Sequence, residues 1–277
     1  MKRAVLAAAV AMAAGGAALG QEPPLKTGID ATFAPHAMAK LSGGIEGFNV
    51  DLANEFARRM HRAIDIDATQ FSGLLPGLQA GSYDFIAAPT TVTKERAENM
   101  LFTEGYLNTD FQFVVRKDAP DVKVLEDLKG KVIAVNKGAV YDSWARDLAD
   151  KIGWTVESYG TNTDAIQAVI SGRAYANVAG NTASAWAVKN NPAIKLSYLY
   201  STGLVWATPV RKDKVALRDQ LDMIIECMKQ DGTFAKMHER WFGLPPPAGS
   251  ATTVIFPGYG VPGMAGYDPT PHELTCS

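Results

Sequence analysis

Residues 64–88 read IDIDATQFSGLLPGLQAGSYDFIAA, and this stretch decides the class of fold. Residues 64–68 alternate apolar and polar side chains, which is typical of a half-buried strand. Leucines at 74, 75 and 78 then lie at helical spacing up to Gly81, and residues 83–88 form a short buried-strand run. Because strand, helix and strand follow one another, the stretch predicts a βαβ unit with parallel strands.

The same alternation continues in both directions along the chain. Residues 25–30 indicate a strand, and residues 50–61 indicate an amphipathic helix between it and the strand at 64–68. Further strands are expected at residues 111–116, 131–135, 155–159, 174–179, 196–199 and 204–210, and further helices at 140–152, 163–172 and 215–230. In such α/β proteins, sites gather at the carboxyl ends of the strands.

The composition is that of an ordinary globular chain. Of the 277 residues, 47% are hydrophobic and 20% are charged, and the length suggests about two domains. The formal net charge is -2, so no basic surface is expected that would hold a nucleic acid or an anionic membrane.

The first twenty residues have the pattern of an export signal. Lys2 and Arg3 precede an apolar run over residues 4–19, and small residues lead to a cut after Gly20. Removal of residues 1–20 would change the net charge to -4. Gln21, not a cysteine, would then begin the chain, so no lipid anchor is expected there. No later stretch has the roughly 20 apolar residues of a membrane span, and we expect a free periplasmic protein without direct membrane insertion.

The sequence has two cysteines, Cys227 and Cys276. In an exported chain an even pair predicts a disulfide, and the alternative is two separate thiols. Cys227 lies in the helical pattern at 215–230, whereas Cys276 ends a Pro/Gly-rich segment without a periodic apolar face. A bond between them would fasten this tail to the body.

A series of motifs extends from residue 25 to residue 243. It comprises LKTGIDATF (25–33), GFNVDLA (47–53), LLPGLQAGSYD (74–84), TVTKER (91–96), FTEGY (102–106), DLKGK (127–131), NKGA (136–139), GTF (232–234) and WFG (241–243). In this order and spacing the chain resembles the family 3 solute-binding proteins, which serve ABC importers of polar amino acids. The resemblance implies a monomer that captures an amino acid or related small carboxylate and delivers it to an ABC transporter permease, without a cofactor.

The resemblance also implies the domain organisation. It corresponds to a type II-like periplasmic binding protein with two α/β lobes, each a mainly parallel sheet flanked by helices. Residues 24–110 and 204–247 would form lobe 1, residues 111–203 would form lobe 2, and residues 248–277 would be the tail. Two crossing segments would make the hinge, and the ligand would lie in the cleft between the lobes.

Several ligand-binding residues follow from the matched motifs. Arg96 would grip a carboxylate through two parallel hydrogen bonds, although without the resemblance a surface ion pair would be the better interpretation. Thr91 would assist the carboxylate, whereas Thr93 is expected to cap the following helix. Phe33 and Phe71 match the aromatic positions that enclose the ligand's side chain.

The opposite lobe is expected to contribute backbone groups. Gly138 and Ala139 lie between a strand and a helix, where free N–H groups can receive an anion. Many relatives have Ser or Thr in place of Ala139. Asp30 is interpreted equally as a reader of a ligand cation or as part of a turn. His36 follows Phe33 closely, and a cleft contact is the minority interpretation for it.

One expected residue is missing. GRAYANVAG (172–180) aligns Gly180, followed by Asn181, with the position where the family usually has an Asp for the α-ammonium of the ligand. A buried ammonium without an anionic partner is costly. Either Asp30 or Asp110 replaces that carboxylate, or the ligand lacks a free α-amine. Asn181 offers only neutral hydrogen bonds.

Two other functions stay open. The first is an enzyme similar to the periplasmic cyclohexadienyl dehydratases, which resemble this family and need a general acid; Glu104, Asp110 and Asp30 are conceivable. The second is a protein-binding module that has lost its ligand and uses the tail as a contact surface. Phosphate-loop, serine-esterase and zincin motifs are absent, and the four histidines are too scattered to predict a metal site.

Overall fold

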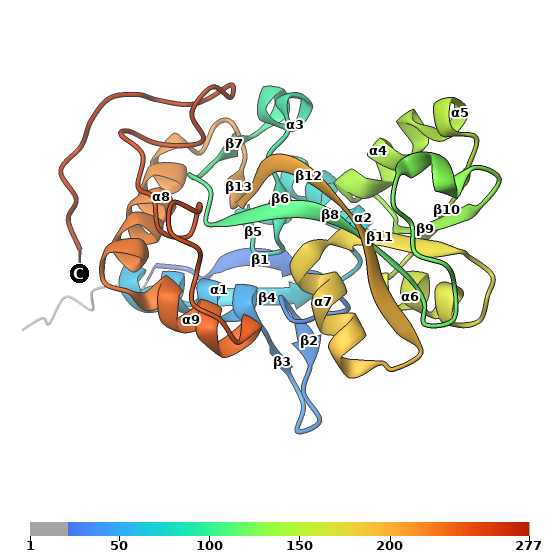
Figure 1. The fold of residues 1–277 in the computed structure, drawn as a ribbon. Helices are drawn as coiled ribbons and strands as arrows, with labels where there is room; N and C mark the ends of the chain where they lie inside the picture. The colour runs from blue at the N-terminus through green and yellow to red at the C-terminus, as the bar shows by residue number, and fades with distance from the viewer. Residues whose placement is uncertain (1–21, 277) are drawn as a thin grey trace, which may run out of the picture.

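Two β-sheets organise the computed structural model, which describes residues 22–276 (Figure 1). The predicted export signal therefore lies outside the described residues. The first sheet has the order β4 (Ile64–Ala68), β1 (Leu25–Ile29), β5 (Phe85–Ile86), β13 (Pro209–Val210) and β7 (Leu101–Phe102). The second has the order β10 (Thr155–Tyr159), β9 (Val132–Asn136), β11 (Ala176–Gly180), β8 (Leu107–Arg116), β12 (Ile194–Ala207) and β6 (Thr90–Thr91). A small hairpin joins β2 (Met38–Ala39) and β3 (Ile45–Glu46).

Helices flank each sheet, as expected for this α/β class. Around the first sheet lie α1 (Phe48–Met60), α2 (Phe71–Gln79), α3 (Lys94–Asn99), α8 (Val215–Gln230) and α9 (Thr233–Phe242). Around the second lie α4 (Val140–Asp147), α5 (Ala149–Ile152), α6 (Asn162–Ile170) and α7 (Asn181–Asn190), and the short 3-10 helix η1 (Leu125–Leu128) precedes β9. The α/β fold with two lobes is thus confirmed.

The sheets are mixed, so the expectation of mainly parallel sheets was wrong. In each sheet three neighbouring strands are parallel: β4, β1 and β5 in the first, and β10, β9 and β11 in the second. The remaining pairs are antiparallel. The antiparallel part arises because the chain crosses between the lobes in β8 and returns in β12.

The strands β8 and β12 connect the two lobes. They pair antiparallel along most of their length, with register shifts between Leu196 and Leu199 and between Tyr200 and Leu204. The predicted lobe boundaries, at residues 110/111 and 203/204, fall inside these two strands. Sequence patterns had suggested separate strands at 196–199 and 204–210, but the polar residues between them belong to one long strand.

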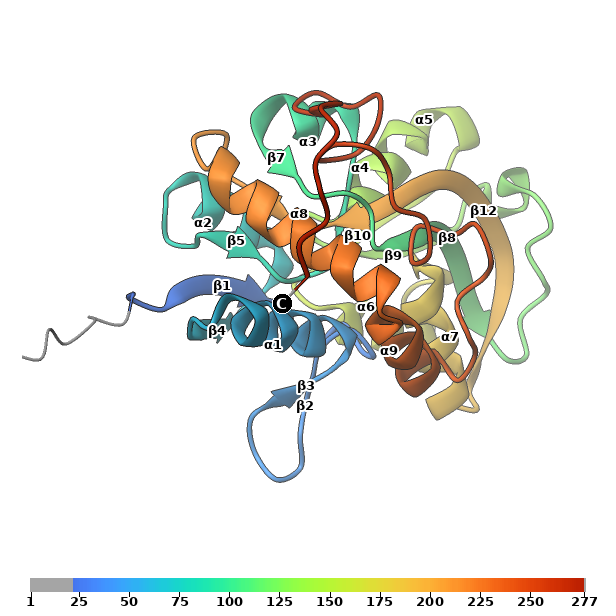
Figure 2. The ribbon, with the colours of Figure 1, turned by 90° about the vertical axis from the view of Figure 1, so that its left-hand side faces the viewer.

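The described part of the tail, residues 248–276, packs along α8 (Figure 2). A disulfide joins Cys227 of α8 to Cys276, which confirms the predicted pair. Arg218 of α8 donates to the carbonyl of Gly266 at 2.8 Å, and Lys229 of the same helix donates to the carbonyl of Val254 at 2.8 Å. The tail is therefore fastened by polar contacts as well as by the disulfide.

Charged side chains are buried under the tail. Lys229 Nζ lies 2.7 Å from Glu104 Oε1, and His272 Nε2 lies 2.7 Å from Glu226 Oε2. Asp222 accepts from the backbone N–H groups of Glu104, at 2.8 Å, and of Gly260, at 2.6 Å. Burial raises the pKa of Asp222, Glu104 and Glu226 and lowers the pKa of Lys229. Each of these charges has a polar partner across the interface.

Candidate functional site

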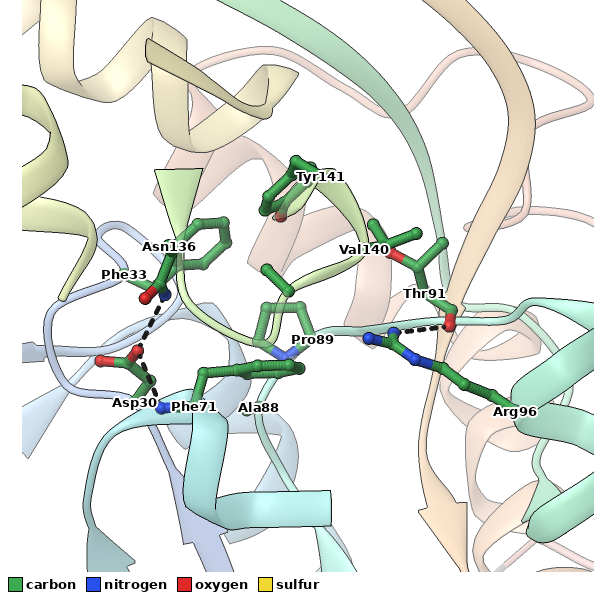
Figure 3. Close-up of a pocket in the computed structure, with 11 residues that line it drawn as sticks. Asp30, Phe33, Phe71, Ala88, Pro89, Thr91, Arg96, Asn136, Val140 and Tyr141 are labelled. Carbon is green, nitrogen blue, oxygen red and sulfur yellow. Dashed lines mark hydrogen bonds between the residues drawn. The ribbon is translucent and has the colours of Figure 1, made fainter. Parts of the chain in front are cut away.

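A small cavity lies between the two lobes (Figure 3). Asp30 follows the carboxyl end of β1, and Asn136 stands at the carboxyl end of β9, where sites are expected in parallel sheets. The free space accommodates about one water molecule, so a larger ligand requires the lobes to separate. The cavity is lined by Asp30, Phe33, Phe71, Ala88, Pro89, Thr91, Arg96, Asn136, Ala139, Val140 and Tyr141. Six of the predicted site residues are among them.

Arg96 brings a positive charge to this cavity. It belongs to α3, whose N-terminus is capped by Thr93 as predicted: the Thr93 hydroxyl accepts from the N–H of Arg96 at 3.2 Å. The guanidinium donates to two backbone carbonyls, of Thr91 at 3.0 Å and of Gly138 at 3.3 Å. Between residues 22 and 276, no carboxylate forms an ion pair with it. Burial lowers the pKa of Arg96, but arginine stays protonated in proteins.

Thr91 presents a hydrogen-bond donor beside Arg96. The indole N–H of Trp206, on β12, donates to the Thr91 hydroxyl oxygen at 3.0 Å. Because this oxygen is used as an acceptor, the hydroxyl hydrogen of Thr91 is available to a ligand. Thr91 and Trp206 are also paired across β6 and β12, which fixes both side chains relative to Arg96.

Trp206 also determines what position 180 can hold. A Cβ placed on Gly180 would lie 2.5 Å from Cζ2 and 2.7 Å from Cη2 of the Trp206 indole. These distances are shorter than real Cβ contacts, and Trp206 is fully buried. The indole thus fills the space of any side chain at 180, including the Asp that is usual in the family.

Asp30 brings a negative charge to the cavity, and it is 3% exposed. Its Oδ1 accepts from the N–H and the hydroxyl of Thr32, at 3.0 and 2.7 Å. Its Oδ2 accepts from the N–H of Phe71 at 3.3 Å and from Asn136 Nδ2 at 3.2 Å. All four donors are neutral, and among the residues that the structure describes no Lys, Arg or His forms an ion pair with Asp30. Asp30 thus forms a turn with Thr32, and its role toward a ligand cation stays a prediction.

Tyr141 and Asn136 complete the polar lining. Burial raises the pKa of Tyr141, and a hydrogen bond from the Gly180 N–H opposes this shift, so the phenol stays protonated and its O–H can donate. The positive charge of Arg96 lowers the pKa of this phenol, and the negative charge of Asp30 raises it. Asn136 Oδ1 is buried without a hydrogen-bond partner. The lining thus includes one unused acceptor near Asp30.

Hydrogen bonds across the cleft hold the lobes together. They join Asp30 to Asn136, Arg96 to Gly138, the N–H of Asn162 to the Thr32 hydroxyl at 3.3 Å, and His36 to Thr182 at 2.8 Å. Two of these four bonds, those of Asp30 and Arg96, involve residues that line the cavity. Lobe closure and the geometry of the site are therefore linked.

Comparison with known proteins identifies the family. Residues 25–244 match the model of the bacterial extracellular solute-binding proteins, family 3. The chain belongs to this family.

Relatives of this family 3 protein are binding proteins. The ABC transporter arginine-binding protein 1 of Escherichia coli (strain K12) is 29% identical over 251 residues, which cover 87% of this chain and 99% of the relative. A solved ancestral arginine-binding protein bound to arginine has a TM-score of 0.77 and 32% identity, covering 80% of this chain and 100% of the other. A solved ancestral amino acid-binding protein, described as a precursor of cyclohexadienyl dehydratase, has a TM-score of 0.74 and 28% identity. The match covers 79% of this chain and 95% of the other.

Two predicted site residues of this family 3 protein do not offer the expected groups. The N–H of Gly138 donates to Asp142 Oδ2 at 3.0 Å, and the N–H of Ala139 donates to the Asn136 carbonyl at 3.2 Å. The prediction of free amides was wrong because Asp142, in the first turn of α4, already occupies the start of the helix. Ala139 still lines the cavity, and the Gly138 carbonyl accepts a hydrogen bond from Arg96.

Three polar residues considered from the sequence lie away from the cavity. Asn181 begins α7 and accepts from the N–H of Asp110 at 3.4 Å. Asp110 itself accepts from the N–H of Thr202 at 2.8 Å, and Glu104 is paired with Lys229 under the tail. None of the three lines the cavity, so Asp30 is the one carboxylate in its lining.

His36 connects the lobes instead of lining the cavity. Its Nδ1 lies 2.9 Å from Asn49 Oδ1, which only accepts, so Nδ1 carries the hydrogen and Nε2 accepts from the Thr182 hydroxyl. Asn49 is oriented by its own bonds to the Ala87 carbonyl at 2.7 Å and the Tyr106 hydroxyl at 2.8 Å. Burial lowers the pKa of His36 to about 4, and the bond to Asn49 opposes this. His36 is thus a neutral interlobe contact.

Sequence reasoning missed Asn136, Tyr141 and Trp206. A signal existed for Asn136, because it ends a predicted strand next to the Lys137-Gly138 turn, where α/β sites gather. Tyr141 lies in the first turn of the helix that follows. Trp206 had no local signal, since its position over Gly180 depends on how β12 crosses between the lobes.

Proposed function

We propose that this protein is the substrate-binding component of an ABC importer and captures an amino acid or related small carboxylate between its lobes. The observation that carries the proposal is the Arg96 guanidinium in the interlobe cavity, with no anionic partner in the described part of the chain. A carboxylate would accept two hydrogen bonds from it and a third from the Thr91 hydroxyl. Membership of family 3 supports the same role.

Ligand binding would stabilise the closed arrangement of the lobes. Arg96 already donates to the Gly138 carbonyl of the opposite lobe, and Asp30 accepts from Asn136. A ligand that contacts both walls adds bonds that exist only in the closed form, and so shifts the population toward it. The closed form would then dock on the membrane permease and release its ligand there.

The proposed location is the periplasm. The export pattern of residues 1–20 supports it, and so does the disulfide, since such bonds persist in oxidising compartments. In the described chain, no helix combines the length and the apolar character that crossing a membrane would require. The mature protein would diffuse between ligand and permease as a monomer.

A binding role is favoured over a dehydratase role by the acidic residues. Of the three candidates for a general acid, Glu104 is paired under the tail and Asp110 lies outside the cavity. Asp30 is held by four neutral donors. None of these three carboxyl groups therefore stands beside Arg96 as a general acid.

The role of Arg96 is tested by calorimetry on mature protein with pentanoate, 5-aminopentanoate, L-ornithine and L-arginine as probes. Arg96→Ala should weaken binding of every probe that the wild type binds by about 100-fold or more, and Arg96→Lys should restore part of the loss. Arg173→Ala removes an exposed guanidinium from the second lobe and should change nothing. Equal affinities of the wild type and Arg96→Ala would refute the proposal.

A further inference from the structure

Two opposite charges face the interlobe cavity, and neither has an ionic partner among residues 22–276. Figure 3 shows Arg96 and Asp30 on opposite sides of the space, with the Pro89 and Phe71 rings between them. Burying a charge without a counter-charge is unfavourable. A ligand that carries a carboxylate at one end and a cation at the other would neutralise both at once.

The Asp30 side of the cavity is suited to a cation. Its Oδ2 has only the two longer hydrogen bonds, at 3.2 and 3.3 Å, so these can yield to a stronger donor. Beside it, Asn136 Oδ1 is an unused buried acceptor that would take a second N–H. The ring of Phe33 also lines the cavity, and aromatic faces attract cations, whereas the Phe71 ring already has the Arg96 guanidinium 5.9 Å from its centroid.

The Arg96 side has no place for an ammonium. Its polar neighbours in the lining are the hydroxyls of Thr91 and Tyr141, and Trp206 blocks any side chain at position 180. An ammonium on the carbon next to the ligand's carboxylate would lie beside Arg96 without a carboxylate to balance it. This side therefore accepts an anion and penalises a neighbouring cation.

We propose that the ligand is an ω-amino or ω-guanidino carboxylate, whose cation lies at the far end of an aliphatic chain and which has no α-ammonium group. The carboxylate is held by Arg96 and Thr91, and the distal cation by Asp30 and Asn136. The inference rests on the proposed function, which needs only the carboxylate. It names the chemical class of the substrate.

The test compares three probes that share one carbon chain. Pentanoate has the carboxylate alone, 5-aminopentanoate adds the distal ammonium, and L-ornithine adds the α-ammonium as well. By calorimetry at pH 7, 5-aminopentanoate should bind at least about 10-fold more tightly than either of the others. L-arginine and its des-amino form, 5-guanidinopentanoate, make a second matched pair and should rank in the same order. In the series from 3-aminopropanoate to 6-aminohexanoate, affinity should pass through a maximum.

The role of Asp30 is tested by Asp30→Asn. This variant should lower the affinity for 5-aminopentanoate to that for pentanoate, and leave pentanoate within about 3-fold of the wild type. Asp110→Asn, outside the cavity, is the control and should keep the preference.

The outcomes distinguish the proposed ligand class from the proposed role of Arg96 in binding a carboxylate. Tighter binding of L-ornithine than of 5-aminopentanoate, or equal binding of pentanoate and 5-aminopentanoate, overturns the ligand class and leaves the carboxylate role of Arg96 standing. Failure of all probes, with wild type and Arg96→Ala alike, overturns both.

Discussion

Charged side chains lie in two buried or half-buried regions of this protein, and the two regions differ in how the charges are matched. Under the tail, Lys229 is paired with Glu104, and Glu226 with His272. In the interlobe cavity, Arg96 and Asp30 lie on opposite walls, and no ion pair in the described chain includes either. Under the tail, Lys229, Glu104 and Glu226 have side-chain partners, and Asp222 accepts from two backbone N–H groups. In the cavity, neither charge has a charged partner in the described chain.

The difference indicates what each region is for. Internally matched charges fix one arrangement, since removing either partner leaves the other buried alone. Unmatched charges favour whatever molecule brings the missing partners, so they serve binding. Substitutions should therefore affect stability at the tail and affinity at the cavity, and the following predictions test this division.

The largest effect on stability is expected for Lys229→Met. The change leaves Glu104 buried beside Asp222 without its cation and should lower the free energy of unfolding by roughly 3 to 5 kcal/mol at pH 8. The pKa of Glu104 is raised by burial, so acidification to pH 5 should protonate it more readily and reduce the loss. Urea unfolding at both pH values measures this.

The exposed residue Lys236 provides the control. Lys236→Met should change the free energy of unfolding by less than about 0.5 kcal/mol. Equal effects of the two lysine substitutions would mean that the pair under the tail adds nothing to stability.

A somewhat smaller loss is expected from removing the disulfide. The double variant Cys227→Ser with Cys276→Ser opens a loop whose ends are 49 residues apart, which should cost roughly 2 to 4 kcal/mol of unfolding free energy. The tail does not line the cavity, so ligand affinity should stay within about 2-fold of the wild type. A large loss of affinity in calorimetry would show that the two regions are not independent.

The smallest of the three expected effects on stability depends on pH and arises from His36. Its pKa of about 4 in the folded state lies below the ordinary 6.5, so the unfolded chain binds the proton more tightly. The contribution of His36 to the free energy of unfolding is fully present above about pH 6.5 and is lost as the pH falls toward about 4. Between pH 7 and pH 5, the resulting loss in the free energy of unfolding is roughly 2 kcal/mol.

The variant His36→Asn isolates this contribution. Its free energy of unfolding should fall less than that of the wild type between pH 7 and pH 5. His61→Asn is the matched control, because His61 is exposed and has a positive φ that Asn tolerates. Parallel pH profiles for the wild type and His36→Asn would contradict the assignment.

Much of this architecture follows from local patterns. The strand at 64–68 and the helix after residue 47 have clear periodicity. Arg96 and Thr91, which line the cavity, followed from the family resemblance and not from local patterns. Local patterns succeed here because each element buries one face against the sheet.

The failures come from long-range packing. Helix α7 was missed because it buries only Ala183 and Ser184 and so has no apolar stripe. The pairing of Glu104 with Lys229 joins residues far apart in sequence, which no spacing rule reveals. The hydrogen bond from the Gly138 N–H to Asp142 could have been predicted, because an acidic residue in the first turn of a helix commonly binds the N–H groups at the start of that helix.

The contact between Gly180 and Trp206 has a consequence for how this chain can change over time. An aspartate introduced at 180 while the indole is present would collide with it, so that step alone yields a damaged site. Replacing Trp206 first removes the obstacle. The two positions are epistatic, and a return to the common residue at 180 is open in one order of mutation and closed in the other. The indole of Trp206 therefore makes the order of the two mutations matter.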